Sequence, residues 1–491
     1  MLVQNPVHFF KSCPSTQLFD EYDVIVVGGG LAGLTTAALC AKKGKRMLLL
    51  ERNYIPGGCA SSYYRNGAVF DTGATTLLGL SEGMPLRIVL DELGIELPAK
   101  QLKVPMLVHL SSGEALARYE NKEAWIAEAE RIFGVKNQRK FWEHCFKLSD
   151  FVWESAMRFR HFPPVNLQDL LSLARNVRFT DVGFLKYAFQ TVEQWINACN
   201  LDDNRSFRQF IDQQLLITAQ NNSQQVNLLF GAAALCYTNY PNYTLPGGMV
   251  TLVKSLTDSI ASNGGHVLYR TEVQKITRSN NKSWEIRSGD LVFKSRDLVS
   301  AIPLHNFNSL IDSSTGKIKI VEGNRLNSAL QFNATLQHWG GADVLHHQVH
   351  TKDGSSSVFF SVSECSDRMR ANEGLRVLSA TTHAHLVGDV EVDKNKWAQQ
   401  VIELAEHRNL FRRDDLVEYH VSDASNWQQW TGRYRGFVGG IPQFRHIKPW
   451  MMNRQQKGDN LFFCGDSVYP GQGIPGVVLS GWQVASRILR K

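Results

Sequence analysis

The sequence has few cysteines, few prolines and no large excess of charge of either sign. Its eight cysteines form no C-x-x-C pair and are too sparse for a disulfide framework, so we expect a reducing, cytoplasmic setting. With 15 prolines and 38 glycines, the chain is neither collagen-like nor of low complexity. Its 53 Lys and Arg residues against 46 Asp and Glu give a formal net charge of +7, which is too diffuse to predict nucleic-acid binding.

Long uncharged stretches are also scarce. Residues 24–41 carry no charge and have almost the length of a membrane-spanning helix, but their three consecutive glycines predict a buried strand, a turn and a helix instead. Residues 1–23 lack the apolar core and the cleavage site of a secretory signal. Because 491 residues exceed the size of a single core, we expect two or more packed units.

The strongest pattern lies near the N-terminus, where an apolar strand over 23–27 leads into Gly28-x-Gly30-x-x-Gly33 and an Ala- and Leu-rich helix. In this pattern Gly28 permits the tight turn, Gly30 lets the backbone approach a pyrophosphate, and Gly33 lets the helix pack on the strand. A second apolar strand ends in Glu51, whose carboxylate is expected to bind ribose hydroxyls. The segment therefore predicts a Rossmann-like unit that binds a dinucleotide.

Two further glycine-rich segments indicate a long cofactor such as FAD. Gly57 and Gly58 follow the ribose carboxylate closely and predict another approach of backbone to the cofactor, although ordinary turns also use such pairs. Near the C-terminus, a strand over 460–464 ends in Gly465 and Asp466, and a glycine loop then opens a helix. The free amides at that helix start suit the end of a flavin that gains negative charge on reduction.

The predicted cofactor-binding residues come from these segments and from short strands near residue 273. They are Gly28, Gly30, Leu31, Ala32, Gly33, Glu51, Arg52, Gly57, Gly58, Cys59, Thr75, Val273, Gly465, Asp466, Gly473, Ile474 and Val477. We assign no catalytic acid or base. We also assign no metal ligand, because the histidines at 346, 347, 350, 383 and 385 have no nearby Cys or carboxylate set to complete a site.

Composition divides the chain into five segments. We expect 20–83, 241–305 and 451–491 to build a Rossmann-like α/β FAD-binding domain of the glutathione-reductase type, closed by both ends of the chain. Residues 306–450 are expected to supply the sheet of an α+β substrate domain, and 84–240 a helical insertion.

Aromatic and basic residues interleave in the helical insertion between positions 136 and 189. Amphipathic helices of this composition lie in a bilayer interface, which makes the insertion a candidate membrane-facing surface. The same pattern also fits a core face with a solvated opposite side. A second cluster, around Trp427 and Arg433, is expected either to line the substrate channel or to pack a domain interface.

At these motifs the sequence resembles the carotenoid (phytoene) desaturase and carotenoid cis–trans isomerase family of FAD-dependent oxidoreductases, which is related to the flavin amine oxidases. The resemblance runs from about residue 22 to the C-terminus and rests on Gly28 to Gly33 with Glu51, Pro56-Gly57-Gly58, Phe70-Asp71-x-Gly73, Pro246-Gly247-Gly248-Met249, Gly265-x-Val267 with Val273, and Gly465-Asp466-Ser467-x-Tyr469-Pro470-Gly471-Gln472-Gly473. The run 465–473 is similar to the isomerase branch, whereas 474–477 is closer to the desaturases, so the branch stays open.

The resemblance implies non-covalent FAD, peripheral attachment to the membrane that holds the substrate, and hydride or electron exchange with a long apolar polyene. Two departures concern the amine oxidases. They usually carry Arg directly after the glycine pair, where this chain has Cys59, so that charge contact is missing or comes from Arg52. We also locate no aromatic pair with a lysine near the flavin. Oxidation of a smaller amine or secondary metabolite is therefore the second hypothesis, and a flavin-binding protein without activity is the third.

Overall fold

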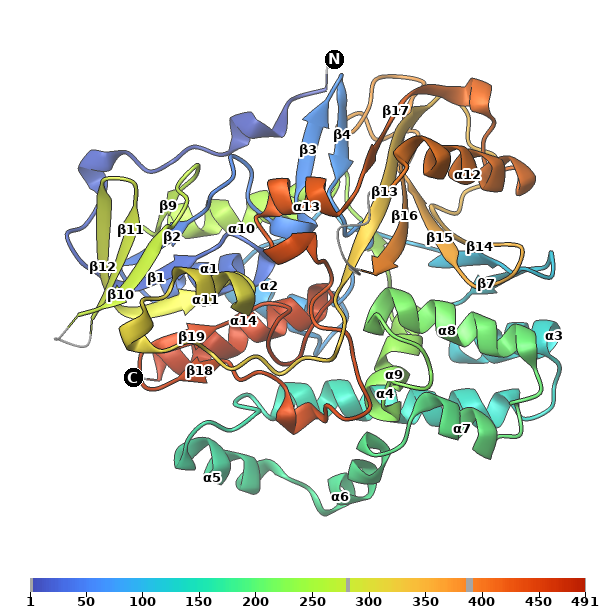
Figure 1. The fold of residues 1–491 in the computed structure, drawn as a ribbon, viewed down its shortest axis with the longest axis horizontal. Coiled ribbons are helices and arrows are strands. Elements are labelled where there is room, and N and C mark those ends of the chain that lie inside the picture. Colours follow the sequence, from blue (N-terminus) through green and yellow to red (C-terminus); the bar gives the residue numbers. More distant parts are fainter. Residues whose placement is uncertain (1–2, 280–282, 386–391, 491) are drawn as a thin grey trace.

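Two large β-sheets organise the chain in the computed structural model, which describes residues 3–279, 283–385 and 392–490 (Figure 1). The first sheet contains strands from both ends of the chain: β1 (Tyr22–Val27), β2 (Met47–Leu50), β9 (His266–Leu268), β10 (Lys275–Arg278), β11 (Trp284–Ser288), β12 (Leu291–Ser300), β18 (Gln456–Lys457) and β19 (Leu461–Phe463). Its order is β10-β11-β12-β1-β2-β9, with β19 paired to β12 and β18 paired to β19. Strands β9, β2, β1, β12 and β19 are mutually parallel neighbours.

The parallel strands of this sheet are short apolar runs because helices cover them. The helices that pack together here are α1 (Leu31–Lys42), α2 (Pro85–Leu93), α10 (Val250–Ser262) and α14 (Ile474–Leu489). All four residues of β2 are buried, as a parallel strand inside an α/β unit requires. Gly33 lies where α1 crosses the turn after β1, and a Cβ atom there would lie 2.1 Å from the Gly28 carbonyl oxygen. The third glycine of the motif therefore has a packing role.

The second sheet is mainly antiparallel and has the order β17-β13-β16-β15-β14-β6-β7. Its strands are β6 (Met106–His109), β7 (Ala115–Arg118), β13 (Asn327–Leu336), β14 (His346–His350), β15 (Ser357–Val362), β16 (Arg376–His385) and β17 (Leu416–Ser422). Strands β6 and β7 come from the segment 84–240, for which composition predicted helices. They pair with each other as an antiparallel hairpin, and β6 also pairs with β14, because the alternating apolar residues of β6 need a sheet face to bury them.

Helix α12 (Lys394–His407) covers one face of the second sheet. Alternate residues of the central strands, such as Phe332, Phe360 and Leu378, pack in one core with Trp397 and Val401 of this helix. The residues between them point to the opposite face, because side chains alternate along a strand.

The helical part of the chain extends from beside the second sheet, in the lower right of Figure 1, along the bottom of the picture to α5. It contains α3 (Lys122–Phe133), α4 (Gln138–Arg158), α5 (Leu167–Asn176), α6 (Phe179–Leu185), α7 (Val192–Ala198), α8 (Arg205–Ala219) and α9 (Leu228–Leu235). Trp125, Trp142 and Phe210 are fully buried in its core, and the guanidinium of Arg118 lies 4.1 Å from the centre of the Trp125 ring. In the described ranges, no helix has both the length and the apolar character needed to cross a membrane.

Smaller elements connect these units. They are β3 (Ser62–Arg65), β4 (Ala68–Asp71), β5 (Lys100–Gln101), β8 (Tyr243–Thr244), α11 (Leu304–Leu310) and α13 (Ala424–Thr431).

A buried ion pair ties α5 to the C-terminal helix. The Asp169 carboxylate accepts hydrogen bonds from the guanidinium groups of Arg487 and Arg490, and the Asp169 and Arg487 side chains are 0% and 2% exposed. Arg487 also donates to the His161 carbonyl at 2.9 Å. Burial by itself would raise the pKa of Asp169, but the two guanidinium groups outweigh it, so the pKa lies below its usual value. The pair therefore holds an otherwise exposed helix against α14.

We expect Arg487→Met to lower the free energy of unfolding by about 3 kcal/mol, because it leaves a buried carboxylate poorly compensated. Chemical denaturation at saturating FAD measures the loss. The matched control is Lys43→Met, which removes an exposed ion pair with Glu92 and should cost less than about 1 kcal/mol. The ion pair keeps the pKa of Asp169 low in the wild type, whereas burial without Arg487 raises it in the variant. The difference in stability should therefore be complete at neutral pH and shrink as falling pH protonates the carboxylate in the variant. Equal losses in both variants would contradict the assignment.

Candidate functional site

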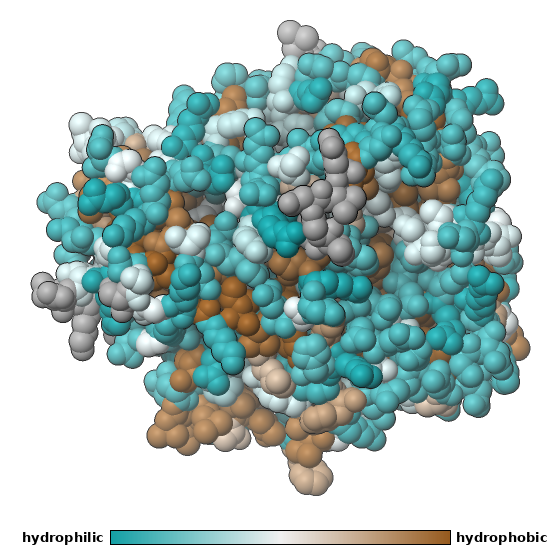
Figure 2. Space-filling view, in the orientation of Figure 1, coloured by the Kyte–Doolittle hydropathy of each residue, from teal (hydrophilic) through white to brown (hydrophobic). Residues whose placement is uncertain are grey.

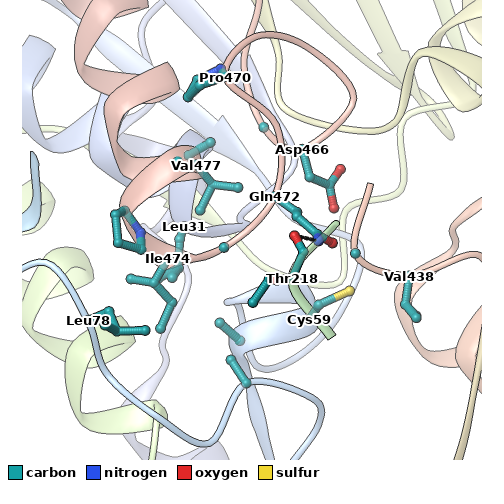
Figure 3. A pocket seen from close by; sticks show the side chains of 18 of the residues that line it. Leu31, Cys59, Leu78, Thr218, Val438, Asp466, Pro470, Gln472, Ile474 and Val477 are labelled. Carbon is teal, nitrogen blue, oxygen red and sulfur yellow. Dashed lines mark hydrogen bonds between the residues drawn. The ribbon is translucent and has the colours of Figure 1, made fainter. Parts of the chain in front are cut away.

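A cavity of about 650 Å³ runs from the glycine loops of the first sheet to the inner face of the second. Most residues that the sequence predicts for the cofactor line it, and Figure 3 shows Leu31, Cys59, Asp466, Ile474 and Val477 converging on it from separate segments. The complete set of predicted residues on its wall is Gly28, Gly30, Leu31, Ala32, Glu51, Gly57, Gly58, Cys59, Thr75, Gly465, Asp466, Gly473, Ile474 and Val477.

Three predicted residues lie elsewhere. Gly33 is inside the contact between α1 and β1, and Val273 is buried in the core on the far side of the first sheet. Arg52 points away from the cavity, where its guanidinium lies 3.6 Å from the carboxylate of Glu272.

Glu51 lines the cavity at the carboxyl end of β2. One carboxylate oxygen accepts the Gly29 amide at 2.7 Å and the other accepts the Asn53 amide at 2.7 Å, which fixes the group at the end of β2. Burial raises the pKa of Glu51, and these two amides oppose that shift.

The starts of two helices, α1 and α14, line the cavity and have free amide donors. Gly30 is the N-cap residue of α1 and Gly473 that of α14, and neither start has a side-chain cap in the described structure. Uncapped helix starts that face a cavity are suited to bind phosphate or an anionic ring. A dinucleotide with two phosphates and a flavin fits this pair of donor sites.

An ion pair occupies the middle of the cavity wall. The Arg433 guanidinium donates to both carboxylate oxygens of Asp466, at 2.9 and 3.1 Å, and to the Phe437 carbonyl at 2.6 Å. Burial raises the pKa of the Cys59 thiol, and the nearby guanidinium of Arg433 opposes the shift. In the part of the chain that the structure describes, Arg433 is the one Lys or Arg on the cavity wall. Arg433 therefore brings a positive charge next to Cys59, which follows the glycine pair. Arg52 does not reach this position.

The sequence left the role of the Trp427 and Arg433 cluster open between channel and interface. Both residues line the cavity, and Trp427 also packs with Ala329, Val438 and Cys59, so the cluster combines the two roles.

A glutamine connects the C-terminal loop to the helical unit. Gln472 donates to the Thr218 carbonyl, drawn as a dashed line in Figure 3, and accepts from Gln220 at 2.8 Å. Because Gln472 belongs to the glycine loop before α14 and Thr218 to α8, this contact fixes the helical unit against the loop.

The rest of the wall has two different sides. The helical side is apolar and aromatic and consists of Phe151, Val152, Trp153, Phe159, Phe162, Leu229 and Phe230. The sheet side comes from β13, β15 and β16 and consists of Ala329, Ser357, Phe359, Ser361, Ser379, Thr381, Thr382 and His383. None of these wall residues was among those predicted for the site from the sequence. Polar residues that alternate along a strand are also typical of a solvated face, so the pattern alone carried no signal for a cavity.

The clustered histidines lie mostly outside the cavity. His109 and His347 stack with ring centres 5.2 Å apart and share a hydrogen bond of 2.9 Å. Burial lowers the pKa of His109 to about 3 and that of His347 to about 4, so both rings are neutral at physiological pH. Over the described residues, no three His, Cys, Asp or Glu side chains gather in a metal-binding arrangement.

The sequence profile of the flavin containing amine oxidoreductases matches residues 31–489. The chain belongs to this family. FAD is accordingly its cofactor, and the fold is the FAD-binding fold of this family, with mixed sheets and helices. The recognition of the family from the glycine motifs is confirmed.

Similar proteins within the family act on different substrates. The chain is 26% identical to the chloroplastic prolycopene isomerase of Daucus carota, over 95% of this chain and 80% of that protein. It is 24% identical to the phytoene desaturase of Phycomyces blakesleeanus, over 94% of this chain and 84% of that protein. Among solved structures, putrescine oxidase bound to putrescine superimposes with a TM-score of 0.64 at 16% identity, covering 96% of this chain and 99% of the other. That likeness shows the shared fold.

Adjacent residues Glu51 and Arg52 give a direct test of the nucleotide end. We expect Glu51→Gln to weaken FAD binding by about tenfold, because it removes a charged acceptor that faces the cavity. Arg52→Gln is the control and should change the affinity by less than about twofold, because its side chain points to Glu272. Titration of the apoprotein with FAD, followed by flavin fluorescence, measures both. Comparable losses in the two variants would place Arg52 among the cofactor contacts instead.

Proposed function

We propose that this flavoprotein acts on a long apolar polyene, by cis–trans isomerisation or by desaturation. The observation that carries the proposal is a large cavity in which the predicted cofactor residues share one wall with a continuous aromatic and apolar surface from α4 and α9. Full-length relatives whose names specify prolycopene isomerisation and phytoene desaturation support the same substrate class. We also propose that segments 20–83, 241–305 and 451–491, which share the first sheet, form the FAD-binding domain.

Bound FAD supplies hydride or electron exchange, and the chain supplies binding, orientation and exclusion of water. We infer that Glu51 holds the ribose and that the starts of α1 and α14 receive the phosphates and the pyrimidine end of the flavin. Arg433, held by Asp466, offers the one positive charge on the described wall. The aromatic side chains of α4 and α9 then hold the polyene against the flavin and keep water away from it.

A protonated amine fits this cavity less well. Such a substrate needs a free carboxylate or an equivalent group, but the two carboxylates on the described wall are already engaged. Glu51 accepts two backbone amides, and Asp466 is paired with Arg433. Amine oxidation therefore stays the second hypothesis.

The exposed surface next to the cavity supports the proposal that the protein attaches to a membrane. Large apolar side chains are exposed on α5, on α6 and in the neighbouring loops, and Figure 2 shows them in brown along the lower edge of the molecule, where Figure 1 places these helices. They are Leu167, Leu170, Leu171, Val177, Phe179, Val182, Leu185, Phe189, Trp450 and Met451, which we call the apolar rim. Phe179 is 95% exposed, which is far more than a core residue of a water-facing helix would show.

The apolar rim is continuous with the cavity. Leu185 and Trp450 are exposed on the rim and also line the cavity, and Trp450 contacts Phe189 with ring centres 5.7 Å apart. Lys448 lies 5.0 Å above the Phe189 ring, so a positive charge accompanies the apolar surface. We infer that the rim dips into the interface of a bilayer with anionic lipid and that an apolar substrate enters from the membrane beside Leu185 and Trp450. On this proposal, some residues within 136–189 face the membrane and others form a core face, so both interpretations of the segment apply.

The proposed reaction is tested by anaerobic incubation of the holoenzyme in liposomes that contain a cis-polyene, with the flavin either oxidised or reduced beforehand. Chromatography with absorbance spectra and mass identifies the products. A product of unchanged mass and altered retention, formed with reduced flavin, indicates isomerisation. A product with a longer conjugated system, formed with oxidised flavin, indicates desaturation. If no polyene changes under either condition, the polyene proposal is wrong and peroxide release from amines becomes the next measurement.

Membrane attachment is tested by the double variant Leu170→Asp with Phe179→Asp. We expect it to reduce co-sedimentation with liposomes at least about tenfold, because burying each apolar side chain contributes roughly 1.5–3 kcal/mol. Val135→Asp is the matched control, since Val135 is 76% exposed but lies outside the rim. Both variants should keep the FAD content of the wild type. Wild-type protein that ignores liposomes, or equal binding by the two variants, would refute the role of the rim.

A further inference from the structure

The sheet side of the cavity is polar, although its other walls are apolar. Along β15 and β16, residues with even numbers, such as Phe360 and Leu378, pack against α12. Residues with odd numbers, including Ser361, Thr381 and His383, face the cavity. The alternation has an exception at Thr382, which also lines the cavity and donates to the Ser357 carbonyl at 2.8 Å. Apart from Phe359, the residues of β15 and β16 on the cavity wall are polar and form one strip.

Some groups on this strip already have partners inside the protein. Ser379 donates to the Asn333 side chain at 2.7 Å, and Ser357 donates to Gln213 at 2.8 Å while accepting from Gln348 at 2.9 Å. These bonds hold the strands and leave those hydroxyls with little capacity for a ligand.

Three side chains on the strip have no such partner. Within the described ranges, the hydroxyls of Ser361 and Thr381 and the ring nitrogens of His383 make no side-chain hydrogen bond. Thr381 and His383 are two residues apart on β16, so they lie roughly 7 Å apart on the same face. His383 pairs across the sheet with Ala329, whose small side chain leaves the imidazole open to the cavity.

The charges around the strip limit what it can bind. Burial lowers the pKa of His383 to about 4, with a smaller contribution from His385, so the imidazole is neutral and can both donate and accept. The one cation on the described cavity wall, Arg433, is already paired with Asp466. A carboxylate or an ammonium group on the substrate would therefore be buried without a counter-charge, which is costly.

A pure hydrocarbon is also a poor match for this wall. It would cover Ser361, Thr381 and His383 and take water away from them without replacing the hydrogen bonds, which costs free energy for each group. A neutral oxygen on the substrate would satisfy them and add no charge.

We propose that the substrate carries a neutral hydroxyl or carbonyl oxygen on its long apolar chain, and that Thr381 and His383 hydrogen-bond this oxygen. The inference rests on the proposed polyene function and narrows it to an oxygenated polyene. The strip then fixes how far the chain enters the cavity, and thereby which carbon atoms lie against the flavin.

The test compares binding of polyenes with one carbon skeleton that end in a methyl group, a primary alcohol or an aldehyde. Dissociation constants are measured on the holoenzyme, under anaerobic conditions in detergent micelles, from the change in flavin absorbance. We expect the alcohol or the aldehyde to bind about tenfold or more tightly than the hydrocarbon. A preference for only one of them identifies the oxygen as hydroxyl or carbonyl.

Two variants assign the preference to the strip. His383→Phe and Thr381→Val should each reduce the ratio of the dissociation constants by at least about threefold, whereas Thr381→Ser, which keeps the hydroxyl, should retain it. Flavin content checks folding, and if His383→Phe does not fold, the wild-type ratio and the two Thr381 variants still decide. Wild-type protein that binds the hydrocarbon as tightly as the alcohol and the aldehyde would overturn the inference and leave the polyene function standing. A ratio unchanged in His383→Phe and Thr381→Val would also overturn it, and binding of none of the three ligands would instead refute the polyene function.

Discussion

Parallel pairing of strands from distant parts of the chain is the constraint on which the site depends. Strand β12 pairs with β1 on one side and with β19 on the other, and β1 pairs with β2. The carboxyl ends of parallel strands meet at one edge of a sheet, which is where α/β folds bind their ligands. The residues that follow these strands, Gly28, Glu51, Ala301 and Gly465, all line the cavity. If β12 did not pair with both neighbours, the glycine loops at the two ends of the chain would not form one site.

The second sheet completes the cavity through the alternation of its side chains. One face of β13, β15 and β16 is apolar and packs on α12, whereas the other presents Ser361, Thr381 and His383 to the cavity. A sheet of this kind is common at a protein surface, where water satisfies the polar face. Here the FAD-binding part and the helices cover that face, so its polar groups need partners from the protein or from a ligand. The specificity that we propose for the substrate thus follows from how the units pack.

The helical part contributes in two ways. Trp125, Trp142 and Phe210 form a dense core with the buried guanidinium of Arg118, which gives the apolar wall a fixed support. Helix α5 lies outside that core and is fastened by the buried pair of Asp169 and Arg487 instead. Helix α6 is held by the ion pair of Asp181 with Arg158 and by Phe184, which stacks on Phe151 of α4. Their apolar side chains can therefore stay exposed without loosening the cavity wall.

The sequence by itself determined the family and the cofactor, and it predicted the nucleotide end of the site, because local spacing decides those features. Glycines that permit a turn and a carboxylate at the end of the next strand act within one β-α-β unit, so Gly28, Gly30 and Glu51 could be identified from the chain alone. Only the tertiary structure decided the rest. Arg433 reaches Cys59 from almost 400 residues away, and His383 faces the cavity because another unit covers its strand. Such contacts depend on packing between units, for which neither spacing nor periodicity along the chain carries a signal.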